Sequence, residues 1–138
     1  MFVANKILHA MEEQQKKNVL IIEQDAIIAL DIQRRFLDQG YNVLGTTATL
    51  SEALKRAPEF KNVDLILVDA GLADFYLRFP LAEKMYRSHE TPLILLASSM
   101  NEKINSLCNE HESVKVLQKP FDNKEFLQAV DSVMNNVN

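Results

Sequence analysis

The sequence predicts an α/β fold, a parallel sheet with helices on both faces, and two observations lead to this. Short apolar runs recur along the chain, and their lack of apolar–polar alternation is typical of strands buried on both faces. Amphipathic stretches lie between these runs and have helical spacing. Five alternations of strand and helix favour a parallel sheet. The expected strands are Val19–Ile22, Val43–Leu44, Leu65–Val68, Leu93–Leu96 and Val114–Leu117.

Each expected strand is followed by an expected helix. Thr49 and Asp122 each stand three residues before a Glu, the spacing at which a capping box satisfies free amide donors at a helix start. Gly40 stands where a left-handed residue would end the first of these helices. The expected ranges are Ile27–Gln39, Leu50–Ala57, Leu81–Arg87, Glu102–Glu110 and Lys124–Met134.

Length and composition indicate one globular domain and exclude several classes of function. The chain has 138 residues, of which 47% are hydrophobic and 25% charged. A net charge of -4 lacks the basic surface that direct nucleic-acid binding requires. The apolar runs are too short to span a membrane, so no membrane association is expected. The single Cys108 and the lack of a signal-peptide pattern favour a reducing cytoplasm.

Residues 1–17 precede the first strand and are expected to form an extra N-terminal helix. Val3, Ile7, Ala10 and Met11 recur at helical spacing. Two interpretations stay open: an extension that packs on the domain, or a helix through which two chains form a homodimer. The sequence does not separate them.

The polar residues of interest follow the expected strands. Glu23, Asp69 and Lys119 come directly after the first, third and fifth strands. Parallel sheets bind ligands at the carboxyl ends of their strands, so these side chains are expected to meet at one edge. Clustered carboxylates repel one another unless a cation neutralises them, and oxygen ligands suit Mg²⁺. Beside such a metal, Asp69 has the chemistry of a nucleophile toward phosphorus, and Lys119 that of a phosphate partner.

Several spaced segments resemble the response regulator receiver domain. They are residues 19–23, 63–74, 92–96 and the Lys-Pro-Phe at 119–121, and the resemblance covers about residues 18 to 135. It implies a flavodoxin-like five-stranded sheet of order 2-1-3-4-5, with residues 18–138 as the receiver domain. It also implies a non-enzymatic role in two-component phosphorelay signalling. Asp69 would accept a phosphoryl group, as an aspartyl phosphate, from a sensor histidine kinase or a phosphotransfer protein.

The resemblance also assigns metal ligands and a phosphate partner. Glu23 matches the first acid of the family's Mg²⁺ pair, Asp69 and the Gly71 backbone carbonyl match its other ligands, and Lys119 matches the phosphate-binding lysine. Where the second acid is usual, this chain has Gln24, a neutral ligand, so Mg²⁺ binding is expected to be weak. Asp25 is either a replacement metal ligand or the cap of the helix that follows, and capping is the favoured interpretation.

The family's switch residues are replaced. Ala97 stands where a Thr or Ser normally bonds the phosphoryl group, and Val116 stands where an aromatic ring is usual. Ser98 either supplies the missing hydroxyl after a small loop shift or is an ordinary loop serine. Ala73 replaces a common Pro, and Leu77 a common Gly.

Two functional hypotheses remain from different classes. Asp69 and Lys119 favour a working phosphoacceptor. Gln24, Ala97 and Val116 favour a pseudo-receiver, a protein-interaction or dimerisation module that is read without phosphorylation. A small nucleotide- or flavin-binding enzyme is disfavoured, because no Gly-rich loop follows the first strand.

Overall fold

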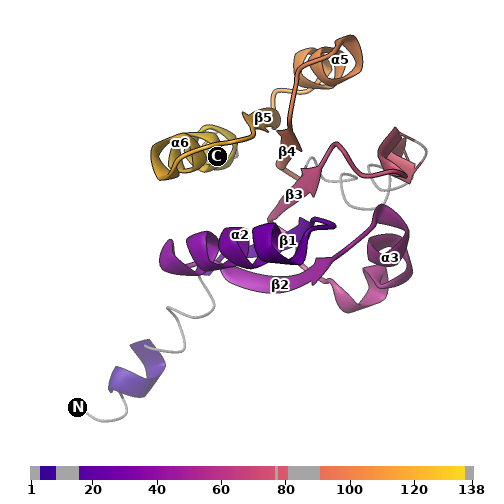
Figure 1. The fold of residues 1–138 in the computed structure, drawn as a ribbon. Coiled ribbons are helices and arrows are strands. Elements are labelled where there is room, and N and C mark those ends of the chain that lie inside the picture. The colour runs from indigo at the N-terminus through magenta and orange to yellow at the C-terminus, as the bar shows by residue number, and fades with distance from the viewer. Residues whose placement is uncertain (1–3, 9–15, 77, 81–90, 136–138) are drawn as a thin grey trace.

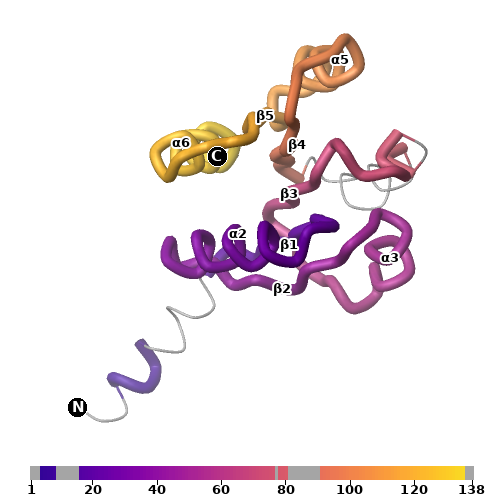
Figure 2. The backbone as a smooth tube through the Cα atoms, viewed as in Figure 1, coloured from indigo at the N-terminus to yellow at the C-terminus, as the bar shows by residue number. Residues whose placement is uncertain are grey.

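The computed structural model describes residues 4–8, 16–76, 78–80 and 91–135. Strands and helices alternate along the chain (Figures 1 and 2). The elements are β1 (Asn18–Ile22), α2 (Ala26–Asp38), β2 (Asn42–Thr47), α3 (Leu50–Lys55), the 3-10 helix η1 (Ala57–Glu59), β3 (Leu65–Asp69), β4 (Leu93–Ala97), α5 (Glu102–Glu110), β5 (Val114–Gln118) and α6 (Asn123–Met134).

All five strands form one parallel sheet in the order β2-β1-β3-β4-β5. This confirms the predicted flavodoxin-like α/β fold. Helices α2 and α6 cover one face, and α3 and α5 cover the other (Figure 1). The central strands β3 and β4 are buried along their whole length, as expected of strands that are covered on both sides.

Two apolar layers hold the helices to the sheet. On one face, Phe36 of α2 and Phe126 of α6 are fully buried, and their ring centroids lie 5.0 Å apart in an edge-to-face contact. On the other face, Leu50 of α3 and Ile104 of α5 pack against alternate residues of the strands. Since the side chains of a strand alternate between faces, both layers draw on the same strands.

The helix boundaries follow the predicted signals closely. The Asp122 carboxylate and Glu125 form a complete capping box at the start of α6, and Thr49 caps α3. Gly40 has φ +83° after α2, the left-handed conformation that glycine adopts at little cost. The predicted helix Leu50–Ala57 is shorter than expected, because the chain turns at Arg56 and continues as η1, which contains Pro58.

Two predicted helices are described in part or not at all. Residues 4–8 are helical, and Ile7 and Leu8 are 55% and 56% exposed, so these two side chains do not pack on the domain. Val3, Ala10 and Met11 lie outside the described residues, as does the predicted helix Leu81–Arg87. Within the part of the chain that the structure describes, no helix has the length and apolar character needed to cross a membrane.

Candidate functional site

Three strand ends bring Glu23, Asp69 and Lys119 together. Glu23 follows β1, Asp69 is the last residue of β3, and Lys119 follows β5. Backbone hydrogen bonds fix each strand end to a neighbour: Glu23 N donates to Thr47 O at 2.9 Å, and Lys119 N donates to Ala97 O at 2.8 Å. The three side chains lie together at one edge of the sheet, as predicted.

The Asp69 carboxylate is held by two donors. Its Oδ2 accepts from Lys119 Nζ at 3.0 Å, and its Oδ1 accepts from the Gly71 amide at 2.8 Å. The Asp69 side chain is 12% exposed and that of Lys119 is 22% exposed, so both reach the surface at one edge. Hydrogen bonds to ionised groups are short and strong, which keeps this carboxylate in one orientation.

Glu23 lies deeper, with a side chain that is 2% exposed. Its Oε1 accepts from the Asp25 amide at 3.3 Å, and its Oε2 lies 3.8 Å from Lys119 Nζ. Burial, together with the neighbouring Asp69 carboxylate, raises the pKa of Glu23 to about 7. Burial also acts to raise the pKa of Asp69, but Glu23, the Gly71 amide and Lys119 together hold it below its ordinary value.

The donors at this site suit a hard divalent cation. Glu23 Oε2 is a buried oxygen with no hydrogen-bond partner among the described residues, and such an oxygen is costly unless something binds it. The described residues contain no group of three or more His, Cys, Asp or Glu side chains placed to hold a metal. A cation here would therefore bind two carboxylates and backbone or water oxygens, a set that Mg²⁺ accepts.

Gln24 and Asp25 directly follow Glu23, and both are exposed. The Asp25 carboxylate caps α2 by accepting from the Ile27 and Ile28 amides at 2.9 and 3.2 Å, as the favoured interpretation holds. Gln24 is exposed and, with Glu23, lines a cavity of about 400 Å³ that is also bordered by Glu52.

The three expected switch positions differ in burial. Ala97, at the end of β4, is 2% exposed, and its methyl group offers no hydrogen bond. Ser98 is exposed, and its carbonyl accepts from Gln118 Nε2 at 3.5 Å. Val116 is partly buried against the core on the α5 face.

Two polar contacts after β3 were not predicted from the sequence. Asp74 Oδ2 accepts from the Ser51 amide of α3 at 3.1 Å, which fixes the loop that contains Gly71. The Tyr76 hydroxyl accepts from Asn101 Nδ2 at 3.0 Å. The position of Asp74, five residues after Asp69 in the segment that resembles the family, was a signal for the first contact. No pattern in the sequence pointed to the second.

Residues 19–131 match the response regulator receiver domain, and the chain belongs to this family. It is 31% identical over 103 residues to the phyllosphere-induced regulator PhyR of Methylorubrum extorquens, covering 75% of this chain and 38% of that protein.

Solved structures share the fold. A response regulator receiver protein from Sinorhizobium medicae has a TM-score of 0.72 at 18% identity, covering 88% of this chain and 97% of that one. A double mutant of the anti-anti-sigma factor PhyR from Bartonella quintana also has a TM-score of 0.72, at 22% identity over 92% of this chain and 52% of that one. The chain thus spans less than half of the curated PhyR and about half of this solved one.

Proposed function

We propose that this chain is a phosphoacceptor: Asp69 takes a phosphoryl group from a phosphohistidine of a sensor kinase or phosphotransfer protein. The observation that carries the proposal is the Asp69 carboxylate itself, which has an exposed edge and lies 3.0 Å from Lys119 Nζ. Asp69 Oδ attacks phosphorus, the P–N bond of the donor breaks, and a P–O bond to Asp69 forms. Lys119 and the Gly71 amide then have charge and donors for the new phosphoryl oxygens.

Glu23, Asp69 and the Gly71 carbonyl are the proposed ligands of a Mg²⁺ ion. When bound, the cation offsets the negative charge that accumulates between carboxylate and phosphoryl oxygens. Glu23 Oε2 supports this assignment, because it is buried and makes no hydrogen bond among the described residues, its ion pair with Lys119 being 3.8 Å long. Gln24 contributes a neutral oxygen where a further acid would strengthen the attraction, which supports weak binding.

The test is the intact mass of the protein after incubation with acetyl phosphate and Mg²⁺. We expect the wild type to gain one phosphoryl group and Asp69→Asn to gain none. Asp38→Asn, which removes an exposed acid on α2, is the matched control and is expected to gain the group normally. A phosphoryl group on Asp69→Asn would move the acceptor to another residue.

A second candidate function is a pseudo-receiver whose surface binds a partner without phosphorylation. Ala97 and Val116 favour it, because neither side chain makes the contacts by which a phosphoryl group could shift the sheet edge. The similarity to a protein named an anti-anti-sigma factor is in keeping with a partner-binding role. A folded wild type that gains no mass under these conditions would favour this function over the first.

The remaining assignments follow from the same proposal. Residues 1–17 are an extension to a receiver domain that spans residues 18–138. Exchange of phosphoryl groups with a kinase suits a cytoplasmic chain.

The exposed Ile7 and Leu8 suit a helix that pairs with a second copy of the chain. Sedimentation of the chain with and without residues 1–17 would test this pairing.

A further inference from the structure

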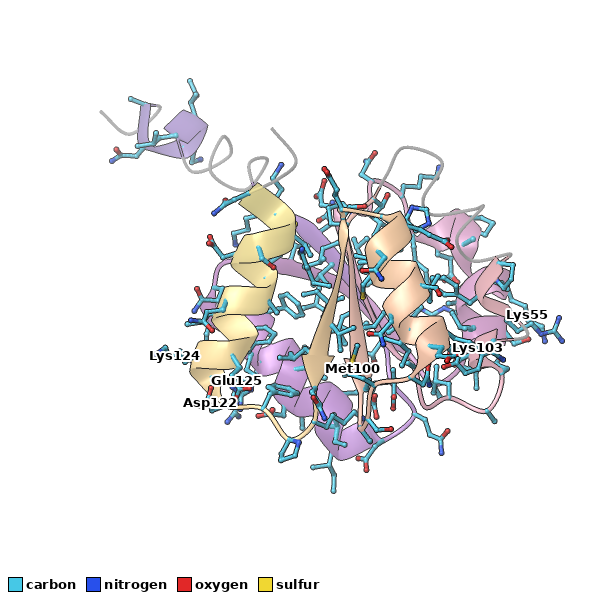
Figure 3. All side chains as sticks on the ribbon, turned by 90° about the horizontal axis from the view of Figure 1, so that it is seen from above. Lys55, Met100, Lys103, Asp122, Lys124 and Glu125 are labelled. Carbon is cyan, nitrogen blue, oxygen red and sulfur yellow. The ribbon has the colours of Figure 1, made fainter. Side chains whose placement is uncertain are left out.

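Tyr76 and Asn101 join the segment after Asp69 to the start of α5. Asn101 Nδ2 donates to the Tyr76 hydroxyl at 3.0 Å, and Asn101 Oδ1 accepts from the Ile104 amide at 2.9 Å. One side chain therefore both caps α5 and binds Tyr76; we call the contact between the two side chains the Tyr76–Asn101 bridge. Lys103 Nζ lies 4.6 Å from the Tyr76 ring centroid, a cation–π contact that adds to it. Figure 3 shows Lys103 and Met100 at this end of α5.

A continuous series of contacts leads from Asp69 to this bridge. Asp69 Oδ1 accepts from the Gly71 amide, and the Asp69 carbonyl accepts from the Leu72 amide at 3.3 Å. The Phe75 amide then donates to Leu72 O at 3.0 Å. Phe75 is fully buried, and its ring centroid lies 4.9 Å from that of Tyr76. The segment from Asp69 to Phe75 is therefore held by backbone hydrogen bonds, and Phe75 packs on the Tyr76 ring.

On the far side of the bridge, α5 depends on Asn101. The helix has nine residues, and its first turn is held by the Asn101 cap and by Ile104, which is 2% exposed in the core. Loss of a capping side chain destabilises the end of a helix. A change in the hydrogen bonds of the Asn101 side chain should therefore affect the first turn of α5 before the rest of the helix.

We propose that the Tyr76–Asn101 bridge couples the chemical state of Asp69 to the first turn of α5. This inference rests on the proposed function in one respect: phosphorylation of Asp69 is the change that the bridge would transmit. A change at one site shifts another only through contacts that differ between the two states. Phosphorylation alters what the Gly71 amide and Lys119 bind, and the bridge carries the resulting shift to α5 without a hydroxyl at residue 97 or a ring at residue 116.

The test compares amide hydrogen exchange of residues 102–105 in four proteins: wild type, Asp69→Asn, Tyr76→Phe and the double variant. Asp69→Asn removes the charge without any phosphodonor, and Tyr76→Phe removes the hydroxyl but keeps the ring. We expect Asp69→Asn to change exchange at these amides by about fivefold when Tyr76 is present. In the Tyr76→Phe background the change should be less than half as large. Equal responses in the two backgrounds, or no response in either, would overturn the proposal.

Two further variants separate the bridge from a general loss of structure. Asn101→Ser keeps a capping oxygen but is too short to bind Tyr76, so it should reduce the response to Asp69→Asn as Tyr76→Phe does. Tyr41→Phe removes a hydroxyl on the opposite face of the sheet, where Tyr41 packs on Phe36, and should leave the response intact. A full response in Asn101→Ser, or a lost response in Tyr41→Phe, would contradict the coupling.

The proposed function is tested separately in the same samples. Beryllofluoride with Mg²⁺ mimics the phosphoryl group, and a shift of the Gly71 amide resonance reports that it occupies the site. An unshifted Gly71 resonance counts against phosphoryl acceptance. The four-protein comparison still decides whether the bridge transmits changes at Asp69.

Discussion

Gln24 is the uncharged residue on which the proposed weakness of Mg²⁺ binding depends. Glu23 and Asp69 supply the carboxylates near Lys119, while Gln24 lies exposed at the rim. Lys119 already offsets one negative charge. A divalent cation therefore meets less negative charge here than it would with an acid in place of Gln24, and its affinity depends on that charge.

Replacing Gln24 by Asp should tighten Mg²⁺ binding about tenfold, the effect of one added charge near a partly exposed cation. Titration with Mg²⁺, followed through the amide resonances of Glu23 and Gly71, measures the affinity. Gln128→Asp on the exposed surface of α6 adds the same charge at a distant place and should change nothing. Equal affinities in wild type and Gln24→Asp would mean that Gln24 is not what limits binding.

At the scale of elements, β2 approaches the chain that follows η1 closely at Gly45. A Cβ at Gly45 would lie 2.9 Å from Phe60 Cε1, and the Phe60 side chain is itself buried. The pairing of β1 with β2 shifts register between Val19 and Leu20, next to the partner position of Gly45. Glycine is needed here because the strand and the ring approach each other, not because of its φ angle.

We expect Gly45→Ala to lower the free energy of unfolding by about 1–2 kcal/mol, since overpacking outweighs the small gain in strand propensity. Urea denaturation measures it. In a Phe60→Leu background the same substitution should cost clearly less, because the ring edge is gone. An unchanged cost in that background would place the strain elsewhere.

Elements and site differ in how far the sequence predicts them. Unbroken apolar runs such as Leu65–Val68 predict buried strands because burial on both faces requires them. Glu23, Asp69 and Lys119 were predicted to meet because parallel strands end at one edge. β2 was predicted as only Val43–Leu44, since its second half is Gly-Thr-Thr and lacks large apolar side chains. The Tyr76–Asn101 contact depends on the conformation of the segments after β3 and β4, and no periodic sequence pattern predicts that conformation.

For the molecule as a whole, the question is how far a change at Asp69 spreads. The bridge reaches α5, whereas Ala97 and Val116 give β5 and α6 no polar contact that depends on the phosphoryl group. The wild type should therefore respond to phosphorylation in the first turn of α5 and little beyond it.

Restoring the two side chains, with Ala97→Thr and Val116→Tyr together, should extend the response to β5. The restored hydroxyl adds one charge-assisted hydrogen bond of about 1.5–3 kcal/mol, comparable to a typical allosteric coupling. Amide exchange over α5, β5 and α6, with and without beryllofluoride and Mg²⁺, measures this. A large change in β5 of the unmodified protein would indicate that Ser98 or another donor already makes the bond.

The stability of the whole domain should fall as pH rises from about 4.5 to about 7 when Mg²⁺ is removed with EDTA. Burial raises the pKa of Glu23 from 4.5 to about 7 in the folded protein. Between these values the folded chain holds a proton that the unfolded chain has lost, so raising the pH favours unfolding. Asp69, whose pKa is lowered, affects the stability only at more acidic pH, below 3.8.

Urea denaturation at several pH values should show a loss of about 2–3 kcal/mol in the free energy of unfolding across this pH window. Glu23→Gln should flatten this dependence, while Glu110→Gln at the exposed end of α5 should retain it. A stability that stays constant through this window would mean that Glu23 is already ionised in the folded protein and paired with Lys119.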